Sequence, residues 1–354
     1  MSHNCASHPL QCIVPPHMLE SIKLRGSAKQ RKMALAMEKQ CDKVRGLRTS
    51  MATPGIAPVP SISGIRKPRV RREVYDGQHK ASLPGVLVRD EKTGASGDKQ
   101  VDQAFVGSGH VYNLYSTIYA RDSLDGNGMT LISTVHHRRN YNNAFWDGKQ
   151  MAYGDGDGEL FQPLTNSLSV IGHEFAHGVI QFSGGLIYQD QSGALNESIA
   201  DVFGVLTVQH KKKQAPAEAN WLVGDGILGN DISGEALRSL RAPGEAYSDP
   251  VLGKDPQPYH MDFYNSTSSD YGGVHINSGI PNHAFFLLAQ YLGGPAWEKA
   301  GRIWYDALQS INNPHATFFD WALETLSAAN LLFGSGSRES LFTRRAWKLV
   351  GLPV

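Results

Sequence analysis

The sequence feature that most constrains this 354-residue chain is the run His173-Glu174-Phe175-Ala176-His177, an H-E-x-x-H motif. It lies within SLSVIGHEFAHGVIQF, whose apolar positions predict a helix. Side chains four residues apart share a face of a helix, so both imidazoles can bind one zinc ion. Glu174 then lies beside the ion, where it can accept a proton from a bound water. The motif alone is also compatible with a partly buried helix that carries two solvated histidines.

A second predicted helix, Ala194–Val208, offers the third protein ligand that a catalytic zinc needs. Glu197 and Asp201 lie four residues apart on one face of it. Glu197 can therefore bind the ion while Asp201 accepts the spare N–H of a ligand histidine. Two carboxylates at this spacing are also typical of a solvated stripe, but apolar residues flank them here. His275, between a glycine pair and a predicted helix, can reach into a cleft, although a lone histidine there is more often structural.

The pattern along the chain predicts strands first and helices afterwards. From Val74 to about Gly158, short alternating segments and turns predict a strand-rich region with one helix near Val101–Ala120. From Thr165 onward the apolar period is helical. The helices expected there are Asn166–Phe182, Ala194–Val208, Ser278–Leu292, Trp297–Ser310 and Thr317–Leu331. With 41% hydrophobic residues the chain can bury a sizeable core, so we expect an α+β protein with two lobes.

The N-terminal part differs from the rest in charge and in cysteine content. Residues 1–72 hold 14 Lys and Arg against 3 Asp and Glu, whereas the remaining residues hold 20 against 30. The cysteines of the chain are Cys5, Cys12 and Cys41, so the larger part has no disulfide. Residues 19–48 predict a helical stretch, and 51–70 have the composition of a linker. We interpret this part as a detachable basic segment.

Several segments, in this order, resemble the thermolysin-like family of zinc metalloendopeptidases. The likeness covers about Val74 to Val354 and rests on YNNAFW (141–146), GDGDG (154–158), HEFAH (173–177), GLIYQDQSGALNESIAD (185–201), RSL (238–240) and GGVHINSGIPNHA (272–284). The short N-terminal segment, with Pro15-Pro16-His17-Met18-Leu19, resembles the protealysin-type branch of that family. The resemblance implies a two-lobed zincin with a β-rich N-terminal lobe and a mainly helical C-terminal lobe. It also implies a zinc site in the cleft and a helical prosegment in front of the lobes.

The resemblance implies roles for individual residues. The zinc ligands are His173, His177 and Glu197. The catalytic groups are Glu174 as general base, His275 and Tyr188 as the donors that stabilise the oxyanion, and Asp270, which orients His275. The residues that hold the ligand histidines are Asn196 and Asp201. The groups that hold the main chain of the substrate are Asn143, the backbone of Ala144, and Arg238. The pocket after the scissile bond is lined by Phe161, Leu164, Val170, Val223 and Leu237.

These assignments predict a neutral zinc endopeptidase, made as a zymogen, that cleaves before bulky apolar residues. Zinc lowers the pKa of its bound water and polarises the peptide carbonyl. Two other interpretations stay open. One is a catalytically inactive relative that binds zinc and peptides. The other is a structural-zinc protein, whose closed site needs a fourth Cys or His ligand, with His275 as the nearby candidate.

The family commonly builds a paired calcium site from carboxylates around the zinc helices, and this sequence departs from that pattern. The residues at the corresponding positions are Ser169, Val208, Asn220, Leu222 and Asp225. Calcium prefers many oxygen ligands, several of them anionic. An insertion at Lys211–Ala219 can shift the alignment of the last three positions. We therefore expect one catalytic zinc and a degraded calcium site.

Residues before about 52 resemble a propeptide that covers the cleft, and the opposite charges of the two parts favour docking. Cleavage within Arg48–Ile56 is a hypothesis, because Met51 and Ile56 suit an apolar pocket. The run RKPRVRR (66–72) is either a solvated charge run or a processing site for a basic-specific protease. Cys12 is either a zinc ligand in a cysteine switch or, as we expect, a buried or incidental thiol.

We divide the chain into a basic prosegment (1–52), a Pro-rich linker (53–73), an N-terminal catalytic lobe with the H-E-x-x-H helix (74–185) and a helical C-terminal lobe (186–354). The expected partners of this monomer are protein and peptide substrates and its own prosegment as an intramolecular inhibitor. We expect no nucleic acid, because the basic segment lacks interleaved aromatics, and no membrane, because no apolar run is long enough. The start lacks a secretory signal, which predicts a cytoplasmic protein or an unusual export route, whereas the resemblance favours secretion.

Overall fold

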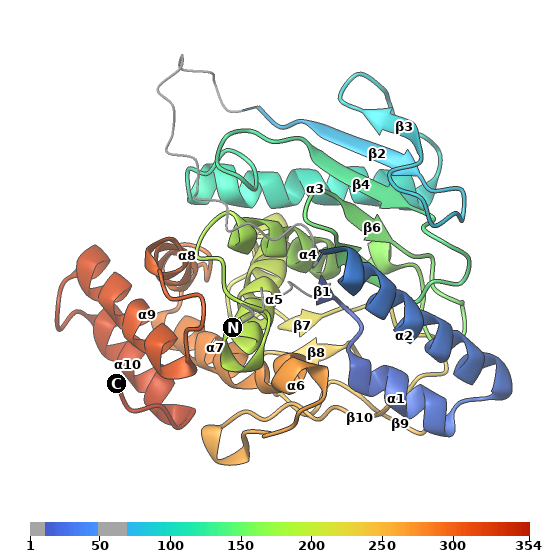
Figure 1. The fold of residues 1–354 in the computed structure, drawn as a ribbon. Coiled ribbons are helices and arrows are strands. Elements are labelled where there is room, and N and C mark those ends of the chain that lie inside the picture. Colours follow the sequence, from blue (N-terminus) through green and yellow to red (C-terminus); the bar gives the residue numbers. More distant parts are fainter. Residues whose placement is uncertain (1–10, 49–68) are drawn as a thin grey trace, which may run out of the picture.

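A computed structural model describes residues 11–48 and 69–354 of the protein (Figure 1). Its strands are β1 (Gln11–Cys12), β2 (Arg72–Asp76), β3 (Val86–Asp90), β4 (Leu131–Val135), β5 (Ala144–Trp146), β6 (Met151–Tyr153), β7 (Leu222–Val223), β8 (Arg238–Ser239), β9 (Ser248–Asp249) and β10 (Gly253–Lys254). Its α-helices are α1 (Pro16–Arg25), α2 (Ala28–Arg48), α3 (Lys99–Ile118), α4 (Leu168–Gln181), α5 (Asp190–Lys212), α6 (Asp270–Asn277), α7 (Gly279–Leu292), α8 (Ala300–Ser310), α9 (Phe318–Phe333) and α10 (Arg338–Leu349). Two short 3₁₀ helices are η1 (Leu164–Asn166) and η2 (Met261–Phe263).

A mixed six-stranded sheet forms the N-terminal lobe, in the order β1-β5-β6-β4-β2-β3. Strand β4 runs parallel to both β2 and β6, and the other neighbours are antiparallel. Helix α3 packs against β2 and β4 and also against α4, so it joins the sheet to the centre of the molecule (Figure 1). The expected strand-rich region with one helix is confirmed, with the helix at Lys99–Ile118.

Helices α4 and α5 lie in the centre, and helices α6 to α10 belong to the C-terminal lobe (Figure 1). The five helices predicted from the period correspond to α4, α5, α7, α8 and α9, within a few residues at each end. Helix α10 was not among the predictions. Its Trp347 stacks on Trp304 of α8 at a ring distance of 5.8 Å, and this tertiary contact buries an otherwise charged segment.

The helical stretch expected over 19–48 is confirmed, and the chain forms two helices there, α1 and α2. Gly26 ends α1, and its N–H donates to the carbonyl of Ile22. Ser27 and Gln30 then form a reciprocal cap, with the Ser27 N–H donating to Gln30 Oε1 and the Gln30 N–H to Ser27 Oγ. Such a capping box starts a new helix. The N-terminal segment therefore folds as a helical hairpin that follows β1.

Parts of the sequence predictions lie outside the described residues. These are Cys5, the linker up to residue 68, and the expected maturation segment after Arg48. Residues 69–72 of the basic run are described, and two of its arginines contact the N-terminal lobe. The Arg71 side chain donates to the carbonyl of Gly128, and Arg72 pairs with Glu91 over the ring of Phe105.

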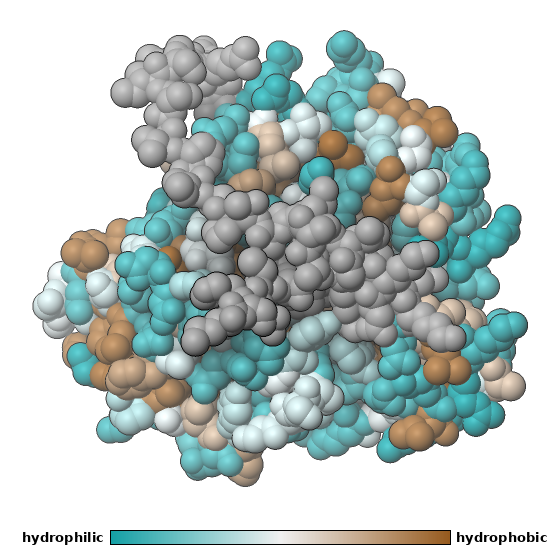
Figure 2. All heavy atoms as spheres, in the orientation of Figure 1, coloured by the Kyte–Doolittle hydropathy of each residue, from teal (hydrophilic) through white to brown (hydrophobic). Residues whose placement is uncertain are grey.

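The surface is mainly hydrophilic on the face that carries α1 and α2, with scattered hydrophobic side chains (Figure 2). Strand β3, at the sheet edge, exposes Val86 and Leu87, and the C-terminal helices expose Leu331 and Leu341. None of the helices in the described ranges combines the length and apolarity that a membrane crossing requires.

Candidate active site

Two neighbouring helices bring the three expected zinc ligands together. His173 and His177 lie on α4, Glu197 lies on α5, and all three side chains are fully buried. The two Nε2 atoms are 3.0 Å apart, and Glu197 oxygens lie 3.6 Å from His173 and 3.5 Å from His177. In the described part of the chain this is the one group of His, Cys, Asp or Glu side chains whose ligand atoms all lie within 4.8 Å of one another.

The hydrogen bonds around these ligands leave their inner atoms ready for a cation. His173 Nδ1 lies 2.8 Å from Asp201 Oδ1, and His177 Nδ1 lies 2.9 Å from Asn196 Oδ1. Both oxygens accept, so each Nδ1 carries the proton and each Nε2 presents a lone pair. Glu197 Oε2 has no hydrogen-bond partner among the described residues. Two facing lone pairs beside a carboxylate oxygen fit Zn²⁺, which takes imidazole and carboxylate ligands in catalytic sites.

Burial favours the neutral form of the His177 imidazole. The pKa of His177 lies well below its ordinary value, first because the ring is buried and second because His173 adjoins it. A neutral imidazole is the form that binds a metal. The position of Asn196 and Asp201 behind the two rings is therefore the one that the sequence predicts.

Glu174 adjoins the ligand group from the same helix. Its Oε2 accepts the backbone N–H of Trp146 on β5 at 3.0 Å. Its Oε1 is buried without a hydrogen-bond partner among the described residues. Burial, and then the charge of Glu197, raise the pKa of Glu174 well above its usual range. A carboxylate with one fixed and one open oxygen, and with a raised pKa, suits an acceptor of protons from water.

His275 and Tyr188 face the ligand group from the C-terminal lobe. The Tyr188 hydroxyl donates to Glu197 Oε1 and lies 3.2 Å from His275 Nε2. Asp270 holds His275 twice, at 2.7 Å from Nδ1 and through the backbone N–H at 2.9 Å. Burial opposes protonation of His275, but the charges of Asp270 and Glu197 outweigh it and raise its pKa to about 9.

The chain reaches this geometry through a left-handed turn before His275. Residues 271–273 of α6 have positive φ, and Gly272 adopts +85°. A Cβ on Gly272 would lie 2.0 Å from Asp190 Oδ1, so a side chain does not fit there. The first glycine of the pair is therefore required by both its positive φ and the lack of space for a Cβ atom.

Arg238 lies next to the ligand group and pairs with Asp201 through two of its nitrogens. Its Nε and one terminal nitrogen donate to the two oxygens of Asp201, both at 2.8 Å. Burial would raise the pKa of Asp201, but Arg238 and His173 hold it well below its usual range. Asp201 thus links a ligand histidine to an arginine that has a further nitrogen to offer.

Two supporting residues escaped the sequence analysis. Asn282 Nδ2 donates to Asp201 Oδ2 at 2.9 Å, and Gln257 Nε2 donates to the carbonyl of His275 at 2.8 Å. Asn282 lies inside the segment GGVHINSGIPNHA, and its position in that motif could have indicated a role in the site. Gln257 had no comparable indication, since it lies outside every quoted motif.

The predicted main-chain contacts of a substrate are made here by the N-terminal segment. The Ile13 N–H donates to the Ala144 carbonyl at 3.2 Å, and the Arg238 guanidinium donates to the Ile13 carbonyl at 3.1 Å. The Val14 N–H donates to Asn143 Oδ1 at 3.0 Å. His275 Nε2 lies 3.0 Å from the carbonyl oxygen of Cys12. Cys12 thus meets the site through its backbone, and the group of ligand atoms described above does not include its thiol.

The residues expected to line the apolar pocket are all buried in the core, as Phe161, Leu164, Val170, Val223 and Leu237. Val223 pairs with Arg238 across β7 and β8, and the Leu237 N–H donates to the Val223 carbonyl. These two side chains therefore adjoin the arginine that holds Ile13.

Three of the five predicted calcium positions, Ser169, Asn220 and Asp225, join Ser167 in a polar network with a single carboxylate, and the other two, Val208 and Leu222, are apolar. Asp225 Oδ1 accepts from Ser167 at 3.1 Å and from Ser169 at 3.4 Å, and Asp225 Oδ2 accepts from Asn220 at 3.3 Å. Ser169 Oγ also accepts the Gly224 N–H at 2.9 Å. The alignment of Asn220 and Asp225 with Ser169 is thus supported by contact, and hydroxyl and amide groups satisfy the carboxylate.

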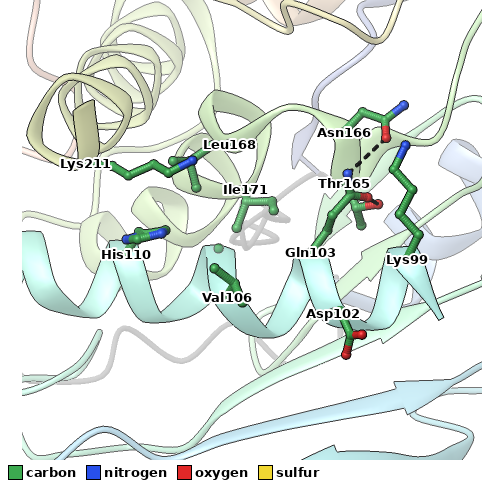
Figure 3. Close-up of a pocket in the computed structure, with 11 residues that line it drawn as sticks. Lys99, Asp102, Gln103, Val106, His110, Thr165, Asn166, Leu168, Ile171 and Lys211 are labelled. Carbon is green, nitrogen blue, oxygen red and sulfur yellow. Dashed lines mark hydrogen bonds between the residues drawn. The ribbon is translucent and has the colours of Figure 1, made fainter. Parts of the chain in front are cut away.

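A second hollow, of about 420 Å³, lies away from this centre between α3, the start of α4 and the end of α5 (Figure 3). Val106, Leu168 and Ile171 form its apolar part, and Lys211 and His110 lie at one end (Figure 3). None of the predicted catalytic side chains lines it.

Comparison with known proteins places two family descriptions on the chain. "Thermolysin metallopeptidase, catalytic domain" matches residues 66–181, and "Thermolysin metallopeptidase, alpha-helical domain" matches residues 184–352. An extracellular metalloprotease of Pectobacterium carotovorum subsp. carotovorum is 41% identical over 349 residues, covering 98% of each chain. Protease PrtS of Photorhabdus sp. is 49% identical over 80% of this chain and 77% of its own. The solved precursor of protealysin from Serratia proteamaculans superimposes with a TM-score of 0.86 and 43% identity, covering 97% of this chain and 99% of that one.

Proposed function

Because the chain belongs to the thermolysin family of metallopeptidases, hydrolases of peptide bonds, we propose that it cleaves internal bonds before bulky apolar residues, with the described form as its zymogen. Glu174 is the general base in this proposal, and His275 and Tyr188 stabilise the oxyanion. The observation that carries it is the convergence of two imidazole lone pairs and a carboxylate beside the open oxygen of Glu174.

The residues of this chain have separable tasks in the proposed reaction. A zinc ion held by His173, His177 and Glu197 supplies an acidified water and a polarised carbonyl. Glu174 accepts the proton of the attacking water and delivers it to the leaving nitrogen. His275 and Tyr188 donate to the oxygen on which negative charge develops, and Asp270 keeps His275 oriented.

Specificity is proposed to come from both main chain and side chain. Asn143, Ala144 and Arg238 hold the backbone of an extended peptide, as they hold residues 13–14 here. The apolar side chains around Val223 and Leu237 favour a bulky apolar residue just after the scissile bond. An acidic substrate residue at this position would bury its charge among apolar side chains, and that burial disfavours its binding.

A structural-zinc role has less support. A closed site needs a fourth protein ligand, and His275 is the candidate. Within the described residues, the group of converging ligand atoms has three members and does not include His275. The Nε2 of His275 is instead directed to the carbonyl of Cys12 and to Tyr188.

The prosegment, residues 1–52 in our division, is proposed to inhibit the catalytic lobes (74–185 and 186–354) by lying where a substrate lies. The likeness to the extracellular metalloprotease of Pectobacterium supports an extracellular destination for this enzyme, which we propose to be a monomer. Maturation near residues 48–56 is part of this proposal.

The test compares the full chain incubated with zinc and with a chelator. We expect zinc-dependent removal of the prosegment, seen by mass spectrometry as a new N-terminus near residue 50. The matured enzyme is then given matched peptides with Leu or Asp after the scissile bond. A preference of about 10–200-fold for Leu is expected from one lost apolar contact. Equal cleavage of the two peptides would contradict the proposed specificity.

A further inference from the structure

Residues 12–14 cross the catalytic centre in an extended conformation and are held there mainly through their main-chain groups. Strand β1 pairs antiparallel with β5, with Cys12 opposite Phe145. After that pair, Ile13 exchanges bonds with Ala144 and Arg238, and Val14 bonds Asn143 through both its N–H and its carbonyl. The segment is therefore held by its backbone along the sheet edge, as a peptide substrate is held in strand addition.

The peptide bond between Cys12 and Ile13 has reactive groups on both sides. On the oxygen side, His275 Nε2 lies 3.0 Å from the Cys12 carbonyl, and Tyr188 lies 3.2 Å from the same nitrogen. On the other side, Glu174 Oε2 accepts the N–H of Trp146, the residue that pairs with Gln11 of strand β1, and Glu174 Oε1 has no hydrogen-bond partner among the described residues. These are the two sides on which hydrolysis needs an oxyanion donor and a proton donor.

The side chains fix which bond lies at the centre. Ile13 and Val14 are 0% and 1% exposed, so a shift by one residue would remove both from their places. Pro15 and Pro16 follow, and Pro16 begins α1. The extended part thus ends two residues after Ile13, and the register cannot slide toward the C-terminus without unwinding that helix.

Helix α1 anchors the segment independently of residues 1–12. Met18, Leu19 and Ile22 are buried, and Ser21 Oγ donates to the Val251 carbonyl at 2.8 Å. His17 Nε2 lies 3.0 Å from the Tyr247 hydroxyl. A chain cut before Ile13 would therefore keep its new end in the cleft.

From this geometry we infer that the Cys12–Ile13 bond is itself a substrate of the active site in the same chain. The inference rests on the proposed function. Water adds its oxygen to the Cys12 carbonyl carbon, the C–N bond breaks, and the Ile13 nitrogen leaves with a proton. The products are residues 1–12 with a carboxylate on Cys12, and a chain that begins at Ile13. This cut precedes the maturation cleavage near residue 50 and leaves the inhibitory helices in place.

The experiment follows the full-length, zinc-loaded chain over time by intact mass and N-terminal sequencing. We expect a chain starting at Ile13, at a rate that does not change with protein concentration, because the reaction is intramolecular. A chelator and the variant Glu174→Gln should each abolish it.

Two matched variants in the prosegment test whether the cleaved bond is the one between Cys12 and Ile13. Ile13→Asp should slow the cut by about 10–200-fold, the range for a lost apolar contact in a specificity pocket. Leu24→Asp, on the 74%-exposed side chain of Leu24 in α1, should leave the rate unchanged. A synthetic peptide spanning residues 8–18 should be cut by the matured enzyme between its Cys and Ile.

The inference and the proposed function fail differently. An intact Cys12–Ile13 bond in a precursor whose matured form hydrolyses casein overturns the inference alone. A cut whose rate rises in proportion to protein concentration overturns its intramolecular nature. A matured form that hydrolyses neither casein nor the peptide overturns the proposed function as well.

Discussion

Two polar clusters include residues of helix α4, and the two differ in the charge of their members. The catalytic cluster brings buried histidines and carboxylates together, with lone pairs directed inward. The cluster around Asp225 has one carboxylate, whose oxygens already accept from Ser167, Ser169 and Asn220. The comparison teaches that polar residues near one another do not define a metal site. A metal site is defined instead by lone-pair atoms that converge on one point and accept no hydrogen bond from the protein there.

The largest effect is expected where the catalytic cluster keeps an open acceptor. Replacing Glu174 with Gln removes the proton acceptor and should lower kcat/KM of the matured enzyme by about 10²–10⁴-fold. Zinc content measured by mass spectrometry should stay at the wild-type level, because Glu174 is not one of the three converging ligands. The matched control is Glu298→Gln, at an exposed position. Unchanged casein hydrolysis in Glu174→Gln would refute the assigned role.

The next effect tests how strongly the catalytic cluster depends on paired charge. Arg238→Met leaves Asp201 buried with one partner fewer, which should cost about 3–5 kcal/mol of unfolding free energy in urea titrations. The exposed Arg241→Met, on the same segment, should cost less than about 0.5 kcal/mol. Equal losses in the two variants would show that the pair is not important for stability.

A smaller, pH-dependent effect is expected at His136, whose partners favour charge rather than neutrality. Its Nδ1 lies 2.9 Å from Asp155 and its Nε2 lies 3.0 Å from Asp98. The hydrogen bond to Asp155 is the main cause that raises the pKa of His136 to about 9, against the effect of burial. A raised pKa stabilises the fold fully below about pH 6.5, and that stabilisation is lost as the pH rises through about 9.

We therefore expect the Tm advantage of the wild type over His136→Gln to shrink by about 2–4 °C between pH 6 and pH 10, as for a solvent-screened pair. Comparing the two proteins at each pH removes the effect of other titrating groups. A Tm difference that does not vary with pH would contradict the prediction.

The smallest effect is expected for calcium. A site with a Kd above about 10 mM contributes less than about 0.1 kcal/mol at 1 mM ligand. One satisfied carboxylate at Asp225 predicts such weak binding, so 1 mM calcium should leave Tm unchanged within about 1 °C. The double variant Ser169→Asp with Asn220→Asp adds two carboxylates beside Asp225 and should make Tm depend on calcium. A large calcium shift in the wild type would break the comparison between the clusters.

The catalytic cluster was predictable because local periodicity fixes most of it. Spacings of four residues place His173 with His177, and Glu197 with Asp201, on single helix faces. Contacts between residues outside one helix were harder to predict from the sequence. Gln257 supports His275 through a backbone carbonyl, a contact that depends on how two distant loops pack.

The helical boundaries show the same limit. The break between α1 and α2 follows from the cap made by Ser27 and Gln30, a pattern that the sequence contains but that one glycine in a basic stretch did not suggest. Helix α10 depends on the burial of Trp347 against Trp304, which no local period reveals. A local cap decided the first case, and tertiary packing decided the second.

Strand β1 is the edge of the six-stranded sheet, and it belongs to the segment that we propose is removed. Its departure would narrow the sheet to five strands and expose the outer edge of β5, where the Ala144 carbonyl would lose the N–H of Ile13. The matured enzyme would thus have an exposed edge strand. That strand could pair with an unfolded chain or with a second copy of the enzyme. In the precursor, strand β1 covers this edge. The prosegment would then prevent aggregation of the enzyme as well as unwanted proteolysis.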